Sequence, residues 1–420
     1  MAISKLAGAL VASSAAAALI VGLTAEAQPR QQVTGPTAVY WASAKTVAGF
    51  GAGASGRPSM MGMMMGGGGG NNAPLGYLTL QLGSTRTAPS PSADHAPPPG
   101  LRVGRLLPLT SPEPTPRPQR APDQMPDQSQ QPQGKIMIFW GCGEHAGPGQ
   151  PITLDFARMT PEQAAGVMAQ SLRNVTFTRE NPPSPTRFAT YGEWPNSRSR
   201  DNKVPMGGSL VGDHLVRGNY TPDIRFSLTP EQDMLARIQM TQNAKNPSGS
   251  AGLAWRPVGR SLAYFVTLMG GQEGRGGQGS TAVMWTSSNV QMLGWAMPEY
   301  LAPGDIPRLL QQGVLLPPTT TACTIPQEVL RAAPQAMFTT IAYGPETNIA
   351  YPPRPANVAT PWNIEYQVKV RTRSEYMGML GVDMGGMGGN SDADDDGDDR
   401  QQPTPAPRPR GPFGIPIPGM

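Results

Sequence analysis

Short apolar or alternating runs, each ended by Gly or Pro, make up most of the patterned part of the chain. The runs lie at 77–82, 135–140, 152–156, 224–228, 253–258, 263–268, 282–285 and 364–371. Alternation of apolar and polar residues is typical of a strand with one buried face, because successive side chains point to opposite sides. The pattern therefore predicts a mainly β fold.

Helix signals are few, and two of them share one motif. Thr160-Pro161-Glu162-Gln163 supplies a capping hydroxyl, a proline at the first helical position and a glutamine three residues after the cap, which predicts a helix through Leu172. Thr229-Pro230-Glu231-Gln232 predicts a second helix over 233–240 in the same way. Two further short helices are expected at 305–312 and 326–332.

The two capping motifs belong to a repeat. Gly143-Glu144-His145 ends fifteen residues before the first motif, and Gly212-Asp213-His214 ends fifteen residues before the second. A degenerate third copy begins at Asp94-His95. Because repeated spacing indicates related structural units, we interpret residues 77–245 as a strand-rich module built from such units.

Residues 251–373 show a different succession of aromatic and β-branched positions. An early strand carries Trp255, the next carries Tyr264 and Val266, and a late strand alternates Tyr366, Val368 and Val370. This order resembles a fibronectin type III or immunoglobulin-like sandwich. The resemblance implies two packed sheets in a domain at 246–376, and it departs from the family where the short helices are expected between 296 and 334.

The N-terminus has the layout of a secretory signal peptide. Lys5 precedes an uncharged apolar run, and Ala25-Glu26-Ala27 follows with small residues at the cleavage positions. The sequence predicts a signal peptide at 1–27 and a periplasmic or secreted protein, with an uncleaved membrane anchor as the alternative. No later run is apolar for long enough to cross a bilayer, so no transmembrane segment is expected in the mature chain.

Proline and glycine are unusually frequent, with 48 and 51 of 420 residues. They limit the size of any core and predict long disordered segments. We expect an N-terminal segment at 28–76 with a Met-Gly linker, and a disordered tail at 377–420. The Met clusters at 60–65 and 377–387 offer thioether ligands for Cu(I), or simply form a linker and part of the tail. The Ala, Gly, Pro and Arg bias indicates a bacterial origin.

The formal net charge is +4, although residues 392–400 form an acidic run. This run opens like a calcium loop but has Pro403 where the twelfth ligand should stand, so a solvated acidic segment is expected. The basic body can meet nucleic acid, anionic lipid or acidic polysaccharide, or present an ordinary solvated surface. Because export disfavours nucleic acid, we expect an envelope protein or a polysaccharide as partner.

Cys142 and Cys323 are the only cysteines. In an oxidising compartment a single pair predicts a disulfide, which here would tie the two halves of the mature chain together. Two free buried thiols are the alternative.

The acid–His pairs are the strongest candidates for a metal site. Glu144 with His145 and Asp213 with His214 offer imidazoles and carboxylates that suit zinc or copper, and Cys142 adds a thiolate if it is not bridged. Neighbours on a strand point to opposite faces, so each pair can instead form only local hydrogen bonds.

No catalytic motif stands out in the chain. It has no serine elbow, phosphate loop, zinc-finger spacing or dinucleotide fingerprint, and Cys142 with His145 matches no nucleophile signature. We therefore expect a non-enzymatic, exported cell-envelope protein with a binding or scaffolding role and no required cofactor. A periplasmic protein that binds zinc or copper is the alternative.

Overall fold

The computed structural model describes residues 31–50, 52, 74–112, 134–197, 199, 201–272 and 280–382. The signal peptide expected at 1–27, the Met-rich run at 60–65 and the acidic run at 392–400 lie outside these residues. Only the first residues of the tail expected at 377–420 are described, and they continue a strand.

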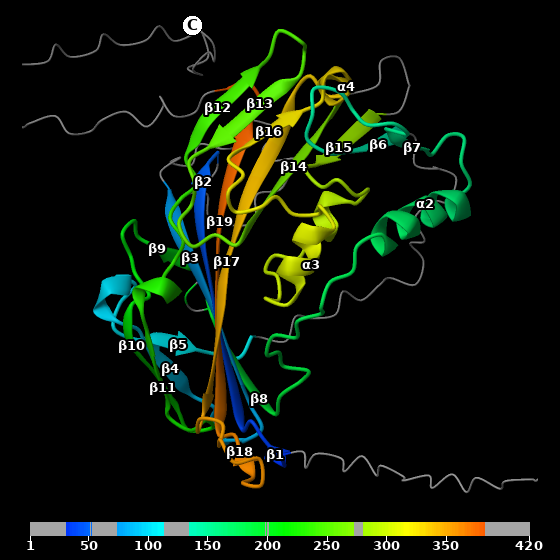
Figure 1. The fold of residues 1–420 in the computed structure, drawn as a ribbon. Helices are drawn as coiled ribbons and strands as arrows, with labels where there is room; N and C mark the ends of the chain where they lie inside the picture. Colours follow the sequence, from blue (N-terminus) through cyan, green and yellow to red (C-terminus); the bar gives the residue numbers. More distant parts are fainter. Residues whose placement is uncertain are drawn as a thin grey trace, which may run out of the picture.

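A strongly twisted sheet of ten strands runs through the described molecule (Figure 1). Its strands are β2 (Ala38–Gly49), β3 (Leu75–Ser84), β6 (Gly134–Trp140), β7 (Ile152–Asp155), β8 (Thr190–Trp194), β9 (Lys203–Val204), β14 (Ala263–Gln272), β15 (Ser280–Thr286), β17 (Ala336–Tyr351) and β19 (Tyr366–Met379). Their order is β7-β6-β15-β14-β17-β19-β2-β3-β8, and β9 also pairs with β3. The pairs β6–β15 and β2–β19 are parallel. The mainly β expectation is confirmed.

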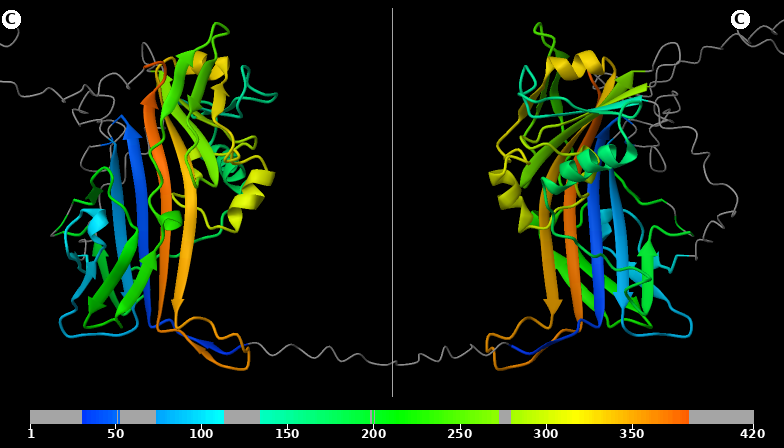
Figure 2. Two further views of the ribbon diagram at one scale, coloured as in Figure 1. Left: turned by 60° about the vertical axis from the view of Figure 1, so that its left-hand side comes forward. Right: turned by 90° about the vertical axis from the view of Figure 1, so that its right-hand side faces the viewer.

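Two small sheets pack against one face of the central sheet (Figure 2). One consists of β4 (Ala93–Ala96), β5 (Leu107–Leu109), β10 (Gly212–Gly218) and β11 (Ile224–Leu228), and the other of β12 (Met240–Lys245), β13 (Ala251–Trp255) and β16 (Ala322–Ile325). A short parallel pair, β1 (Val33–Thr34) and β18 (Trp362–Asn363), lies beyond the lower end of the long strands.

The long strands β2 and β19 alternate between the two faces of the sheet. Their even-numbered residues, such as Tyr40 and Val368, pack into the core beneath the four-stranded sheet, and we call this side the covered face. Their odd-numbered residues, such as Trp41 and Lys369, point to the opposite side. Residues 175–188, which we call the strap, cross that side, and we call it the strap face.

The described residues form three α-helices: α2 (Pro161–Arg173), α3 (Asp305–Gln311) and α4 (Gln327–Ala332). Each lies where the sequence predicts a helix. At the start of α2, the Gln163 N–H donates to Thr160 Oγ1 and the Thr160 N–H donates to Gln163 Oε1, at 3.3 and 2.9 Å. This capping box satisfies two backbone donors that the first turn leaves without helical partners.

The helix expected over 233–240 is wrong. The second capping motif forms only the 3-10 turn η2 (Pro230–Gln232), although its capping box is complete. Arg260 donates hydrogen bonds to the carbonyl oxygens of Asp233 and Met234, at 2.8 and 2.7 Å, and so occupies acceptors that a helix would use. Tertiary contacts therefore override the local helix signal.

A disulfide joins Cys142, in the turn after β6, to Cys323 on β16. The two Cα atoms lie 5.3 Å apart, across a sequence separation of 181 residues. The bridge therefore connects the central sheet to the three-stranded sheet, as the cysteine pair predicts.

Strands from three of the expected segments lie side by side in the central sheet. β2 comes from the segment at 28–76 and pairs with β19 from the domain at 246–376. β6 comes from the module at 77–245 and pairs with β15 from that same domain. Strands from different expected segments therefore pair within one sheet.

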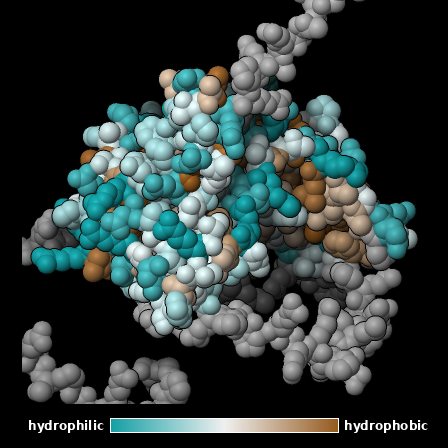
Figure 3. All heavy atoms as spheres, turned by 90° about the horizontal axis from the view of Figure 1, so that it is seen from below, coloured by the Kyte–Doolittle hydropathy of each residue, from teal (hydrophilic) through white to brown (hydrophobic). Residues whose placement is uncertain are grey.

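Apolar side chains gather on the surface near α2 when the molecule is seen from below (Figure 3). Leu172 on this helix is 42% exposed, and Trp295 in the 3-10 turn η3 (Gly294–Ala296) is 56% exposed. A further 3-10 turn is η1 (Pro99–Leu101). Within the described ranges, no helix combines the length and the apolar character that a bilayer span needs.

Candidate functional site

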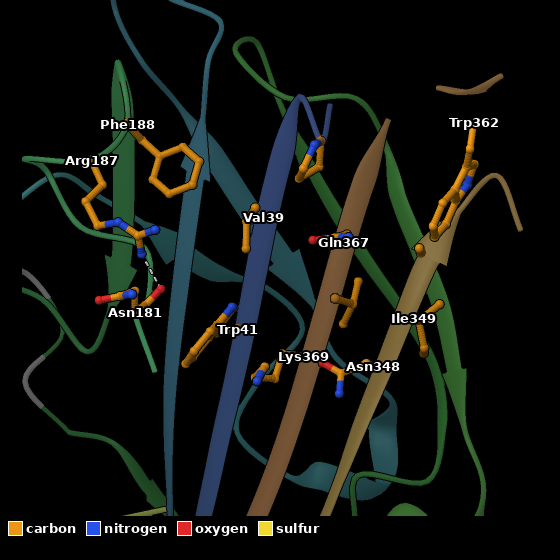
Figure 4. A pocket seen from close by; sticks show the side chains of 13 residues that line it. Val39, Trp41, Asn181, Arg187, Phe188, Asn348, Ile349, Trp362, Gln367 and Lys369 are labelled. Carbon is orange, nitrogen blue, oxygen red and sulfur yellow. Dashed lines mark hydrogen bonds between the residues drawn. The ribbon is translucent and has the colours of Figure 1, made fainter. Parts of the chain in front are cut away.

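A pocket of about 630 Å³ lies on the strap face, where the strap, β2, β19 and β17 meet (Figure 4). Its side chains include the rings of Trp41, Phe188 and Trp362, the amides of Asn181, Asn348 and Gln367, and the cations Arg187 and Lys369. They come from stretches near residues 36–41, 181–188, 348–350 and 362–369, which only the fold brings together.

Each of the three aromatic rings is held in place. Trp41 is 6% exposed, and the Lys369 ammonium and Arg371 guanidinium each lie 4.7 Å from its ring centroid. The Trp362 indole N–H donates to the carbonyl oxygen of Pro352 at 2.9 Å. Phe188 lies against Gly83 on β3, where a Cβ atom would come within 2.4 Å of the ring. The pocket is therefore pre-formed.

The strap is tied to α3 at its upper end. The Thr178 N–H and hydroxyl donate to the Asp305 carboxylate at 2.7 and 3.0 Å, and Arg308 donates to the Thr176 carbonyl oxygen at 2.7 Å. Burial raises the pKa of Asp305, but the hydrogen bonds from Thr178 and Arg308 outweigh it, so that the pKa lies below its ordinary value. Asp305 therefore holds the strap as an ionised carboxylate.

Lys369 joins the strap to β17 through two carboxylates. Its ammonium contacts Glu180 of the strap and lies 2.8 Å from Glu346 of β17, while Arg371 donates to Glu180 at 2.9 Å. Burial raises the pKa of Glu180, but the hydrogen bond and charge of Lys369, helped by Arg371, lower it below its ordinary value. The positive charge of Lys369 is therefore compensated within the protein.

Charged side chains continue along β19 beyond the pocket. We call the series formed by Lys369, Arg371, Arg373 and Glu375 with their partners the ionic ladder. Arg373 and Glu375 are 7% and 9% exposed and contact each other, and Lys45 lies 3.4 Å from Glu375. Glu299 adds an exposed carboxylate 3.3 Å from Arg373. Burial lowers the pKa of Arg373, but the Glu375 carboxylate outweighs it and raises the pKa above its ordinary value.

Arg187 is the one pocket cation without a carboxylate partner among the described residues. Its Nη1 donates to the carbonyl oxygens of Asn181 and Pro182 in the strap. The side chain is exposed, and Figure 4 shows it beside Phe188 and Asn181. The residue thus carries an uncompensated positive charge at the pocket edge.

The covered face behind the pocket holds a neutral chain of hydrogen bonds. Tyr40 Oη lies 2.9 Å from His95 Nδ1, His95 Nε2 lies 3.0 Å from His214 Nδ1, and His214 Nε2 lies 2.7 Å from the Leu210 carbonyl oxygen. The carbonyl can only accept, so His214 Nε2–H donates to it, His95 Nε2–H donates to His214 Nδ1, and Tyr40 O–H donates to His95 Nδ1. Each ring nitrogen therefore has a partner while both imidazoles are neutral.

Burial strengthens this assignment. It lowers the pKa of His95 well below its ordinary value, and the neighbouring His214 lowers it further. Burial also lowers the pKa of His214, and this outweighs the hydrogen bond to Leu210 and the charge of Asp213, which raise it. Both rings stay uncharged at neutral pH.

The structure does not bring the two acid–His pairs together around one metal ion. His145 lies in the exposed turn after β6 with Nδ1 3.1 Å from Glu328 Oε1, and Glu144 offers only its carbonyl oxygen to the Gln327 N–H in the same region. On β10, His214 is buried while Asp213 is exposed on the other side and bonds Ser227. The described residues contain no group of three or more His, Cys, Asp or Glu suited to a metal.

The histidine that His214 meets is His95, from the degenerate copy of the repeat, because β4 and β10 pair antiparallel. His145 occupies a turn rather than a strand. The repeat spacing therefore does not place the three histidines in equivalent surroundings.

Sequence reasoning missed the pocket residues. The alternation at 364–371 does place Lys369 and Arg371 on the polar side of a strand, which is the one signal that could have pointed to them. Trp41, Phe188 and Trp362 carry no motif, and their proximity follows only from the pairing of distant strands.

No protein-family model, no curated protein and no solved structure matches the chain. The chemistry of the pocket is therefore interpreted from its own geometry.

Proposed function

We propose that this chain is an exported cell-envelope protein that binds a segment of polysaccharide in the pocket beneath the strap. The observation that carries the proposal is the combination of three fixed aromatic rings with three amide side chains in one pocket. The volume of about 630 Å³ falls within the range of about 300–1,000 Å³ that is usual for small-ligand sites.

The side chains of the pocket suit the two kinds of surface that a sugar presents. A pyranose ring has an apolar face of C–H groups, against which the faces of Phe188 and Trp362 can stack. Its hydroxyl groups both donate and accept hydrogen bonds, and so do the amides of Asn181, Asn348 and Gln367. The Asn348 amide already donates to Glu346 Oε1 at 2.8 Å, so a purely apolar ligand would leave the amides of Asn181 and Gln367 without a ligand partner, at a cost in affinity.

Export and the envelope location belong to the proposal. They are supported by the N-terminal sequence pattern and by the bridge between Cys142 and Cys323, since disulfides persist in oxidising compartments. We also retain the immunoglobulin-like resemblance of residues 251–373 as part of it. Two packed sheets around Trp255 and Tyr264 support that resemblance, and such sandwiches recur in adhesion.

Calorimetric titration of the full chain tests the proposal with three soluble hexasaccharides: β-linked glucose, β-linked N-acetylglucosamine and α-linked galacturonic acid. We expect saturable binding of at least one of them. Trp362→Ala and Phe188→Ala should each weaken that binding about tenfold or more, because stacked aromatic anchors dominate small binding sites.

Trp295→Ala is the matched control, because Trp295 is 56% exposed but does not line the pocket. It should leave the affinity unchanged. Absence of binding to all three hexasaccharides at millimolar concentration, or equal loss in the Trp295 and Trp362 variants, would overturn the proposal.

A further inference from the structure

We infer that the sugar bound beneath the strap carries a carboxylate, as a uronic acid does, and that Arg187 pairs with it. This inference rests on the proposed function and narrows its ligand class. It follows from the charges of the pocket and from which of them the protein already uses.

The pocket lining is one-sided in charge. The described residues that line it include two basic side chains, Arg187 and Lys369, and no acidic one. Because Glu180 and Glu346 compensate the charge of Lys369, the positive charge that an acidic sugar would meet is that of Arg187. The chain as a whole also carries a formal net charge of +4, which favours the approach of a polyanion.

Lys369 is not the residue that reads this charge. Its ammonium is shared between Glu180 and Glu346, and its side chain is only 17% exposed. A ligand carboxylate would have to compete with two carboxylates that are already in place. The charge of Lys369 therefore serves to hold the strap to β17.

Arg187 is free to bind a ligand carboxylate. Only its Nη1 is engaged, by the carbonyl oxygens of Asn181 and Pro182. Within the part of the chain that the structure describes, its Nε and Nη2 groups have no hydrogen-bond partner. These two groups form the edge of a guanidinium that grips a planar carboxylate with two parallel hydrogen bonds.

The neighbouring residue places this edge beside a stacking surface. Phe188 follows Arg187 directly, and both line the pocket. Gly83 lets the Phe188 ring lie close to β3. A single uronic acid unit can therefore stack on Phe188 while its carboxylate meets Arg187, so that ring and charge are recognised together.

Paired ligands that differ only in the carboxylate test this inference. The full chain is titrated with hexagalacturonate and with the same hexamer after reduction of each carboxylate to a hydroxymethyl group. We expect the acidic hexamer to bind about 10- to 100-fold more tightly, as a charge-assisted bidentate hydrogen bond implies, and the preference to fall in high salt.

Arg187→Gln should remove this preference, because it should lower the affinity for the acidic hexamer far more than the affinity for the reduced one. Arg187→Lys, which keeps the charge but loses the two-pronged edge, should retain part of the preference. Arg158→Gln is the matched control, because Arg158 is 83% exposed and lies outside the pocket. Circular dichroism checks that each variant is folded.

The outcomes separate the two proposals. Equal binding of both hexamers by the wild-type chain, or a preference that survives in Arg187→Gln, would refute the role of Arg187 while the polysaccharide function stands. If neither hexamer nor the neutral sugars bind, the proposed function itself fails and the inference fails with it.

Discussion

On the covered face of β2 and β19 the buried polar groups are neutral, whereas on the strap face they are charged. Tyr40 lies between Val39 and Trp41 in sequence. Its hydroxyl belongs to the series of hydrogen bonds through His95 and His214, whereas Val39 and Trp41 line the pocket. On the covered face, Tyr40, His95 and His214 form hydrogen bonds through fixed tautomers, without any ion. On the strap face, Lys369, Arg371 and Arg373 pair with carboxylates.

The difference shows how one strand can serve a core and a site at once. Alternation sends even residues of β19 into an apolar layer and odd residues into an ionic ladder. The neutral hydrogen bonds of the covered face have a small free-energy cost of desolvation, but they cannot accept an extra proton. The ionic ladder needs every partner present, because an unpaired buried charge is expensive.

The largest effect is expected from Lys369→Met. It leaves the carboxylates of Glu180 and Glu346 without their shared cation in a mostly buried position, which should lower the free energy of unfolding by about 3–5 kcal/mol. Urea denaturation measures the change. Lys45→Met is the control, since its side chain is 28% exposed and its loss should cost about 1 kcal/mol or less. Equal losses in the two variants would contradict the idea that the ladder near the pocket is the tightly coupled part.

Tyr40→Phe tests the neutral chain on the other face. The change removes only the hydroxyl that donates to His95 Nδ1, and leaving this buried acceptor unsatisfied should cost about 1–3 kcal/mol in the free energy of unfolding. Tyr351→Phe, at a tyrosine that is 47% exposed, should change it by about 0.5 kcal/mol or less. A neutral outcome for Tyr40→Phe would show that the hydrogen bond contributes no net stability.

Lowering the pH should reduce the stability first through the histidines of the covered face and then through the carboxylates of the strap face. The folded-state pKa values of His95 and His214 are lowered, so the unfolded chain binds more protons and stability falls as the pH drops below the ordinary histidine value of about 6.5. The pKa of Glu180 is also lowered, so a second loss begins only as the pH falls below the ordinary glutamate value of about 4.3.

Urea midpoints measured from about pH 8 to about pH 2 cover both steps. His95→Gln keeps an acceptor for Tyr40 and a donor for His214 but cannot titrate, so it should flatten the upper step and leave the lower one. His145→Gln, in the exposed turn, is the matched control. An upper step that persists unchanged in His95→Gln would rule out His95 as its source.

The smallest effect is expected from Glu299→Gln. Glu299 is 57% exposed, and Arg373 keeps its contact with Glu375 when the outer carboxylate is removed. The free energy of unfolding should change by about 0.5 kcal/mol or less, because exposed ion pairs contribute little. A loss comparable to that of Lys369→Met would place the centre of the ladder at its outer end instead.

Much of the local structure can be predicted from the sequence, because its signals are local. The capping box at Thr160 and strands such as 263–268 follow from cap signals and alternation. The short helices near 305 and 327 form where they are expected, although neither begins with a side-chain cap. The mistaken helix after Thr229 shows the limit. Its caps are correct, but Arg260 takes the carbonyl oxygens of that segment from outside it.

The pocket could not be predicted, because each of its features depends on distant pairing. Lys369 and Arg371 alternate visibly along their strand, but Glu180 lies 189 and 191 residues away from them. Without that partner the alternation predicts only a solvated face. The strand containing Trp41 carries β-forming residues such as Val39 and Tyr40, but its own sequence does not identify β19 as its neighbour.

The parallel pairing of β2 with β19 also means that β2 cannot find its neighbour until late in synthesis. Ser43 lies opposite Arg371, at a separation of 328 residues, so β2 emerges long before the strand that must lie beside it. At about 5–20 residues per second, translation leaves this apolar strand waiting for tens of seconds. Such long-range pairing favours slow folding, and a chaperone that shields β2 until the ribosome has passed residue 379 would keep the unfinished chain from aggregating.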